Sequence, residues 1–72
     1  MMNQEFKLLN VIALLKDIPT MNLRKGQVGT IVEMHDNENL EVEFCNKKGE
    51  TIALLQLNSK DVLLLRYELE VV

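Results

Sequence analysis

This 72-residue chain has one histidine, His35, and one cysteine, Cys45, the two side chains best suited to nucleophilic catalysis. Nucleophilic catalysis needs a base beside a serine, cysteine or threonine, and a third group that orients the base. His35 lies in the polar segment 35–39, whereas Cys45 ends a later apolar run. A lone cysteine is most simply a small strand residue, and a lone histidine in a polar turn is most simply solvated. The sequence therefore predicts a protein that is not an enzyme.

Neither a metal site nor a cofactor site is predicted. His35, Asp36 and Glu38 are close in sequence, but a tight turn rarely aims neighbouring side chains at one point, whereas a metal needs convergent ligands. Glu41 and Glu43 share one face of a strand, where we expect both carboxylates to be solvent-exposed rather than to act as a general acid and a general base. The chain also lacks the glycine-rich loop of a phosphate-binding site. We therefore expect no cofactor, no metal and no small-molecule substrate.

The charge balance disfavours nucleic acid as a partner. The chain carries 11 acidic and 8 basic residues, for a formal net charge of −3. Its basic residues fall in short pairs such as Arg24-Lys25 and Lys47-Lys48, among carboxylates. Nucleic-acid readers instead present a basic patch that neutralises phosphates. A protein partner is the better expectation.

No membrane segment is predicted. The longest uninterrupted apolar run, Val11 to Leu15, is far shorter than the ~20 residues that span a bilayer. The start of the chain, 1–16, carries polar residues through its apolar stretch and lacks a small-residue cleavage site, so it does not resemble a signal peptide. We expect a cytoplasmic protein.

Five short apolar runs separated by turn residues predict an all-β domain. The clearest run is 40–45, in which Leu40, Val42 and Phe44 alternate with other residues at the period of a half-buried strand. The predicted strands are 8–15, 27–34, 40–45, 51–57 and 62–65. Between them the residue types fit a long loop, a tight turn and one 3₁₀ turn, at 16–26, 46–49 and 58–61.

This succession predicts a small five-stranded SH3-like barrel with N- and C-terminal extensions. A single domain is expected over 1–72, with its core at about 8–65 and an extra C-terminal strand at 66–72. Gly26 and Gly49 are expected in turns, where glycine can take a positive φ. Gly29 lies inside a strand, and we expect a bend there that lets the strand serve both halves of the barrel.

Apolar residues, 47% of the chain, exceed what the inside of so thin a barrel needs. Both faces of the run 51–57 are apolar, and the tail 66–72 alternates apolar residues with glutamates. The predicted interaction surface consists of Ile52, Leu54, Tyr67, Leu69 and Val71. Two interpretations stay open: a homodimer or partner protein covers this surface, or the arm 1–7 and the tail cover the surplus apolar residues of the strands within one chain.

The segment Gly26-Gln27-Val28-Gly29-Thr30-Ile31-Val32-Glu33 resembles the KOW element of SH3-like domains in ribosomal and transcription proteins, which bind RNA or protein. An RNA-binding barrel using Arg24, Lys25, Lys47 and Lys48 is therefore an alternative function.

A longer resemblance covers nearly the whole chain. The series VIALLKDIP at 11–19, LRKGQVGTIVE at 23–33, EVEF at 41–44 and GETIALLQL at 49–57 resembles a bacterial family of small domains of unknown function, family 4926, frequent in cyanobacteria. The resemblance implies an SH3-like barrel with no catalytic residues. It also implies similarity to small barrel subunits that dock ferredoxin in electron-transfer complexes. Some members lie beside toxin-like genes, which implies an antitoxin- or immunity-like inhibitory partner.

The function expected from the sequence is thus a non-catalytic protein-interaction module, with the inhibitory partner of a toxin-like protein as its first candidate role. The alternatives are the RNA-binding barrel and the electron-transfer docking subunit.

Overall fold

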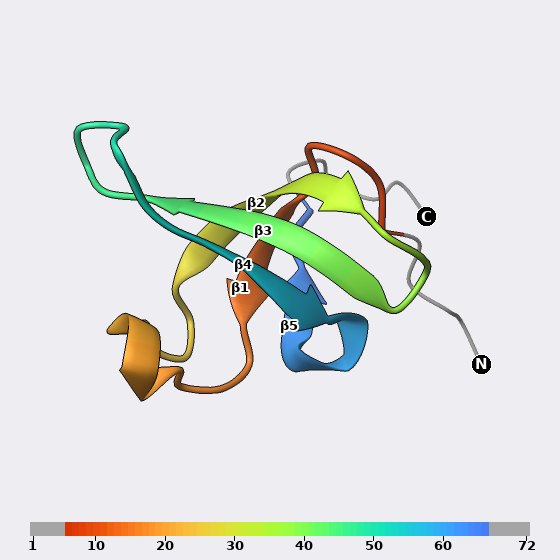
Figure 1. Cartoon of the computed structure of the whole chain (residues 1–72), viewed down its shortest axis with the longest axis horizontal. Coiled ribbons are helices and arrows are strands. Elements are labelled where there is room, and N and C mark those ends of the chain that lie inside the picture. Colours follow the sequence, from red (N-terminus) through yellow and green to blue (C-terminus); the bar gives the residue numbers. More distant parts are fainter. Residues whose placement is uncertain (1–5, 67–72) are drawn as a thin grey trace, which may run out of the picture.

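The computed structural model describes residues 6–66, and five short β-strands make up most of its regular structure (Figure 1). The strands are β1 (Val11–Leu14), β2 (Val28–Met34), β3 (Asn39–Cys45), β4 (Thr51–Asn58) and β5 (Val62–Leu64). Two single-turn 3₁₀ helices, η1 (Pro19–Met21) and η2 (Ser59–Asp61), lie in the connections. No α-helix occurs in these residues, and no helix among them is long and apolar enough to cross a membrane.

The strands form one antiparallel sheet in the order β4-β3-β2-β1-β5. The prediction of a small five-stranded all-β fold is confirmed. Figure 1 shows the sheet strongly curled, with β1 and β5 running across the direction of β3 and β4. Within residues 6–66 β4 and β5 remain the two ends of the sheet, so it is not closed into a barrel.

The inner face of the curled sheet holds the core. Leu40, Val42 and Phe44 on β3 are fully buried, as their alternation predicts, while Glu41 and Glu43 point to the other side and are half-buried. Strands β1, β2, β4 and β5 add further aliphatic side chains to the same cluster, and Leu23 joins it from the loop before β2. The described core contains no buried polar or charged residue. It is held by apolar packing alone.

The first strand is shorter than predicted. We expected it to begin at Leu8, but β1 begins at Val11. Leu8 and Leu9 form an exposed turn in which the Lys7 N–H donates to Asn10 Oδ1 at 2.8 Å and the Asn10 N–H donates to the Lys7 carbonyl at 3.1 Å. The Asn10 side chain therefore ends the extended run that the leucines alone would favour.

The three glycines have two different roles. Gly26 and Gly49 take positive φ values of 91° and 82° in turns, as expected for glycine. Gly29 was predicted to mark a bend, but the irregularity in β2 lies further along, between Ile31 and Glu33. At Gly29 the constraint is space: a Cβ there would lie 2.7 Å from Val42 Cγ1 and 2.8 Å from Phe44 Cε1. Gly29 thus allows β3 side chains to pack over the β2 backbone.

The turns match the predicted chemistry. Asn58 accepts a hydrogen bond from the Lys60 N–H at 3.0 Å and begins η2, the predicted 3₁₀ turn. At the β3–β4 turn, Asn46 Oδ1 accepts from the N–H groups of Lys48 and Glu50. The tail prediction, a strand at 66–72 bearing Tyr67, Leu69 and Val71, lies outside the described residues apart from Arg66.

Candidate functional site

The outer face of β4 carries the exposed part of the predicted interaction surface. Ile52 and Leu54 are 48% and 53% exposed, whereas Ala53 and Leu57 on the opposite face are buried. The alternation along β4 is therefore as predicted, with one apolar face in the core and the other turned outward. The remaining members of the predicted surface, Tyr67, Leu69 and Val71, lie outside the described residues.

One side of the β4 backbone pairs with no other strand of residues 6–66. β4 is an end strand of the sheet in residues 6–66. The Ser59 N–H donates to the Glu38 carbonyl, and Asn39 faces Asn58, so from Ala53 onward the odd-numbered residues of β4 bond to β3; before Ala53 the register shifts, with Ile52 as the extra residue. The N–H and C=O groups of Leu54 and Gln56 consequently point away from the sheet. An unpaired row of this kind is a template for another strand.

The free strand carries no charge and no proline. Its sequence, TIALLQLN, has only amide and hydroxyl polar groups. Natural proteins usually protect an edge strand with lysine, proline, a β-bulge or a very short length. β4 has eight residues, no lysine and no proline, and its one register shift, at Ile52, leaves the run from Ala53 to Asn58 regular. The other end strand, β5, has three residues, and a 3.2 Å ion pair between Lys16 and Asp61 lies beside it. β4 is therefore the edge on which a partner strand could pair.

A second apolar area lies across the outer face at the other end of the sheet. Ala13 of β1 pairs directly with Val28 of β2 and with Leu63 of β5. Val28 and Leu63 are 50% and 43% exposed. Glu43, whose Oε2 accepts a 2.6 Å hydrogen bond from Thr51, faces Leu54 from β3. The outer face is thus divided into two apolar areas with a carboxylate between them.

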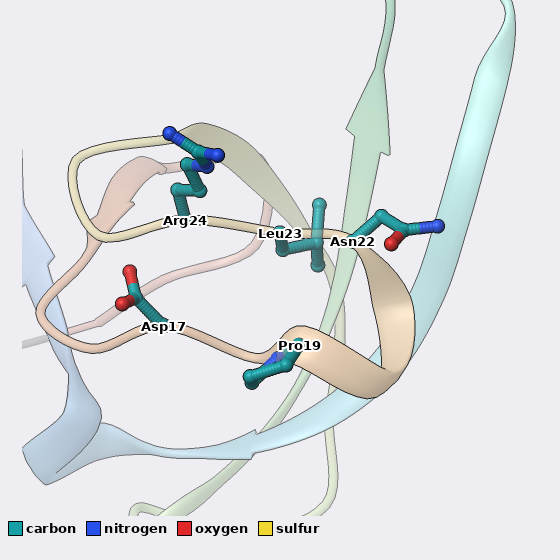
Figure 2. Close-up of a pocket in the computed structure, with 5 residues that line it drawn as sticks. All are labelled: Asp17, Pro19, Asn22, Leu23 and Arg24. Carbon is teal, nitrogen blue, oxygen red and sulfur yellow. The ribbon is translucent and has the colours of Figure 1, made fainter.

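A shallow pocket of about 350 Å³ lies in the loop between β1 and β2 (Figure 2). Asp17 and Arg24 come from the two arms of this loop, and Pro19 opens the 3₁₀ turn between them. Asp17 Oδ1 accepts the Lys25 N–H at 2.8 Å, and Gln27 Oε1 accepts the Arg24 N–H at 3.1 Å, so these polar side chains hold the loop's own backbone. No nucleophile with a base beside it lines the pocket.

The four basic residues considered for RNA lie on two different loops. Arg24 and Lys25 are exposed in the loop that contains η1, and Lys47 and Lys48 are exposed in the β3–β4 turn. Within residues 6–66, neither pair forms an ion pair.

The structure places His35 differently from the sequence prediction. His35 was expected to be a solvated turn residue with Asp36 and Glu38 as its acidic neighbours. Instead His35 Nε2 lies 3.0 Å from Glu41 Oε1 on β3 and 3.9 Å from Glu33 Oε2 on β2. These three side chains form a cluster whose ligand atoms all lie within 4.8 Å of one another. Sequence reasoning missed it because Glu41 comes from the neighbouring strand.

Asp36 is occupied by the turn itself. Its carboxylate accepts hydrogen bonds from the Asn39 side-chain amide and from the N–H groups of Glu38 and Asn39, at 2.8–3.0 Å. These bonds favour the ionised form and, led by that of the Asn39 side chain, hold the pKa of Asp36 below its ordinary value. Asp36 therefore closes the β2–β3 turn.

A model of the protein family described as "Domain of unknown function (DUF4926)" matches residues 8–64. The chain belongs to the DUF4926 family. The match spans all five strands of this DUF4926 domain, from the turn before β1 to the last residue of β5. Comparison with curated proteins and with solved structures gave no match.

Proposed function

We propose that this DUF4926 domain is a non-catalytic protein-interaction module that pairs along β4 with a second copy of itself. The observation that carries the proposal is the β4 edge, which no strand of residues 6–66 covers and which combines outward backbone groups, exposed Ile52 and Leu54, and no charged residue. A strand added to such an edge gains main-chain hydrogen bonds, while side-chain contacts on each face select the partner.

A second copy of the chain can pair with this edge because the strand carries no charge that would repel its own copy. In a two-fold pair a residue at the axis meets its own copy, so a charge at that position would face a like charge. Thr51–Asn58 contains none. An antiparallel pair with its axis near Leu54 sets the two Leu54 side chains against each other and places Ile52 of each copy opposite Gln56 of the other. Full burial of one such side chain contributes roughly 1.5–3 kcal/mol, and about half of each is exposed in the single chain.

The fold that we propose behind this surface is SH3-like. Three features support it: the antiparallel order β4-β3-β2-β1-β5, the long loop between β1 and β2, and the 3₁₀ turn η2 directly before β5. In this arrangement β4 and β5 are neighbours in sequence but lie at opposite ends of the sheet. The curl of the sheet, rather than a closed hydrogen-bond ladder, encloses the core.

The test is the association state of the full chain, measured by light scattering and sedimentation over a series of rising concentrations. We expect a monomer–dimer equilibrium that Leu54→Lys abolishes, because a lysine on the edge strand would face its own copy. The matched control is Val28→Lys, which adds the same charge at an equally exposed position on the outer face of an internal strand. It should leave dimerisation unchanged.

Two further results distinguish the β4 edge from other surfaces. Amide exchange of Leu54 and Gln56 should slow as the concentration rises, because these N–H groups become paired. Deletion of residues 67–72 should leave the dimer in place. A chain that stays monomeric at every concentration, a dimer that survives Leu54→Lys, or a dimer lost with the tail alone would each contradict the proposal.

The roles suggested by resemblance stay predictions. These are the inhibitory partner of a toxin-like protein, the KOW-like RNA-binding barrel and the electron-transfer docking subunit. The RNA-binding role predicts affinity for single-stranded RNA that weakens steeply as salt rises. Arg24-Lys25 and Lys47-Lys48 lie on two loops at the same end of the sheet, but the net charge of −3 still disfavours this role.

A further inference from the structure

The β2–β3 hairpin brings together a ligand set that lies apart in the sequence. Glu33 Oε2, His35 Nε2 and Glu41 Oε1 converge on the outer side of the sheet, where Glu33 and His35 are exposed and Glu41 is half-buried. Two carboxylates and one imidazole are oxygen and nitrogen donors of the kind that zinc uses in proteins. The cluster lies at the end of the β2–β3 hairpin and does not include the β4 edge.

A β-bulge creates the cluster. Thr30 faces Glu43 and Ile31 faces Val42, and if that register continued, Glu41 would face Val32. Instead the register shifts by one residue, and Glu33 faces Glu41 directly. A bulge re-aims side chains and is found preferentially beside functional sites. Here it replaces a valine–glutamate pair with two opposed carboxylates.

Directly opposed like charges on neighbouring strands destabilise a sheet. The backbone register itself sets Glu33 against Glu41, so the arrangement favours a positive charge between the two carboxylates. His35 Nε2 lies against both of them. An ion bound by all three groups would relieve the repulsion between the glutamates.

We propose that Glu33, His35 and Glu41 form a binding site for a divalent transition-metal ion of the Zn²⁺ type. Donors at the usual metal–ligand distances of about 2.0–2.2 Å around a tetrahedral ion are roughly 3.3–3.6 Å apart. The two separations from His35 Nε2, 3.0 Å to Glu41 and 3.9 Å to Glu33, lie on either side of that range. The carboxylate oxygens of Glu33 and Glu41 lie within 4.8 Å of each other, so side-chain rotations that draw the two carboxylates together would bring the three donors to one ion.

The donor set selects among ions. Mg²⁺ and Ca²⁺ prefer oxygen ligands in larger number, whereas an imidazole nitrogen favours zinc and its neighbours among the transition metals. Three protein ligands leave the remaining positions of the ion open to water or to a group from another molecule. Because Glu33 and His35 are exposed, that open side faces solvent.

The test is calorimetric titration of the full chain with Zn²⁺, and separately with Mg²⁺ and Ca²⁺. It uses a Cys45→Ser background, because the exposed thiol of Cys45 is itself a possible zinc ligand. We expect one Zn²⁺ per chain, with His35→Gln, Glu33→Gln and Glu41→Gln each weakening the affinity by on the order of tenfold or more. Glu38→Gln is the matched control, since it removes a carboxylate from the same hairpin outside the cluster, and it should leave the affinity unchanged.

A second readout is the NMR signal of the His35 ring nitrogens, which should shift on addition of Zn²⁺ if Nε2 binds the ion. Amide spectra of each variant establish that the fold is retained. Equal zinc affinity in all the variants, or comparable binding of Mg²⁺ and Ca²⁺, would mean an adventitious ion only and would overturn the proposal. Loss of binding on Cys45→Ser alone would also overturn it, by placing the ion at the thiol.

Discussion

The two faces of the sheet differ in almost every physical property although they are made by the same strands. The inner face presents Leu40, Val42 and Phe44 in full burial, with no polar group among them. The outer face of the same strand presents Glu41 and Glu43, and on β4 it presents the exposed Leu54. Because alternate residues of one strand face opposite sides of the sheet, residues that stabilise the fold and residues available for binding can lie side by side in the sequence. Substitutions on one face should change folding, and those on the other should change binding.

The sharpest form of this comparison uses two leucines of β4. Leu57 is 6% exposed and Leu54 is 53% exposed. Leu57→Ala should lower the free energy of unfolding by about 2–5 kcal/mol, because it removes buried methyl groups and leaves a cavity. Leu54→Ala should change it by no more than about 0.5 kcal/mol in the monomer. Urea unfolding at low protein concentration measures the free energy of unfolding of both variants. Equal losses would show that the two faces of β4 contribute equally to stability.

Gly29 tests how closely the inner side of β3 packs on β2. Gly29→Ala introduces a Cβ at 2.7–2.9 Å from Val42 Cγ1 and two ring atoms of Phe44, both fully buried residues. Overpacking of this kind typically costs about 1–3 kcal/mol. The urea midpoint should fall accordingly. The control is Thr30→Ala, the next residue on the opposite side of β2, which should have a smaller effect. A midpoint unchanged by Gly29→Ala would show that Val42 and Phe44 can move aside.

The smallest expected effect is the loss of folding stability at low pH. Since the core of residues 6–66 has no buried titratable group, the pH dependence of stability that these residues contribute must come from the outer face and the turns. The pKa of Asp36 is held below its ordinary value of 3.8. Its contribution to stability is therefore present above the unfolded-state pKa and is lost as the pH falls through the lower folded-state value.

Asp36→Asn keeps an oxygen acceptor but removes this titration. The stability difference between the parent chain and the variant should shrink as the pH is lowered from neutral to below the ordinary pKa of Asp36. Parallel urea unfolding series at each pH measure that difference. If it stayed constant across the range, the hydrogen bonds of Asp36 would not depend on its charge.

The strand pattern of the domain could be read from the sequence to different degrees in different places. β3 was predicted to within one residue, because three large apolar side chains alternate without interruption and turn residues flank them. β1 was predicted to begin three residues too early, because Leu8 and Leu9 are apolar and extend the apolar run of the strand. These leucines instead form a turn, which is closed by a hydrogen bond to the Asn10 side chain that residue types alone did not reveal.

The candidate sites were predictable only in part. The outward position of Ile52 and Leu54 followed from alternation along one strand. The cluster of Glu33, His35 and Glu41 did not, because it depends on which residue of β2 faces Glu41. The extra residue at Val32 changes that partner, and the sequence carries no glycine at the bulge to mark it.

Local sequence was enough to predict that five strands form, which residues of β3 enter the core, and the turns at Gly26 and Gly49. Each of these follows from local chemistry: side-chain period, or the φ angle that only some residues tolerate. What only the tertiary structure decided is the pairing between strands, which left β4 as a free edge, packed β3 over Gly29 and set Glu33 against Glu41. Pairing depends on contacts between residues distant in the chain, and a shift of one residue changes every partner beyond it.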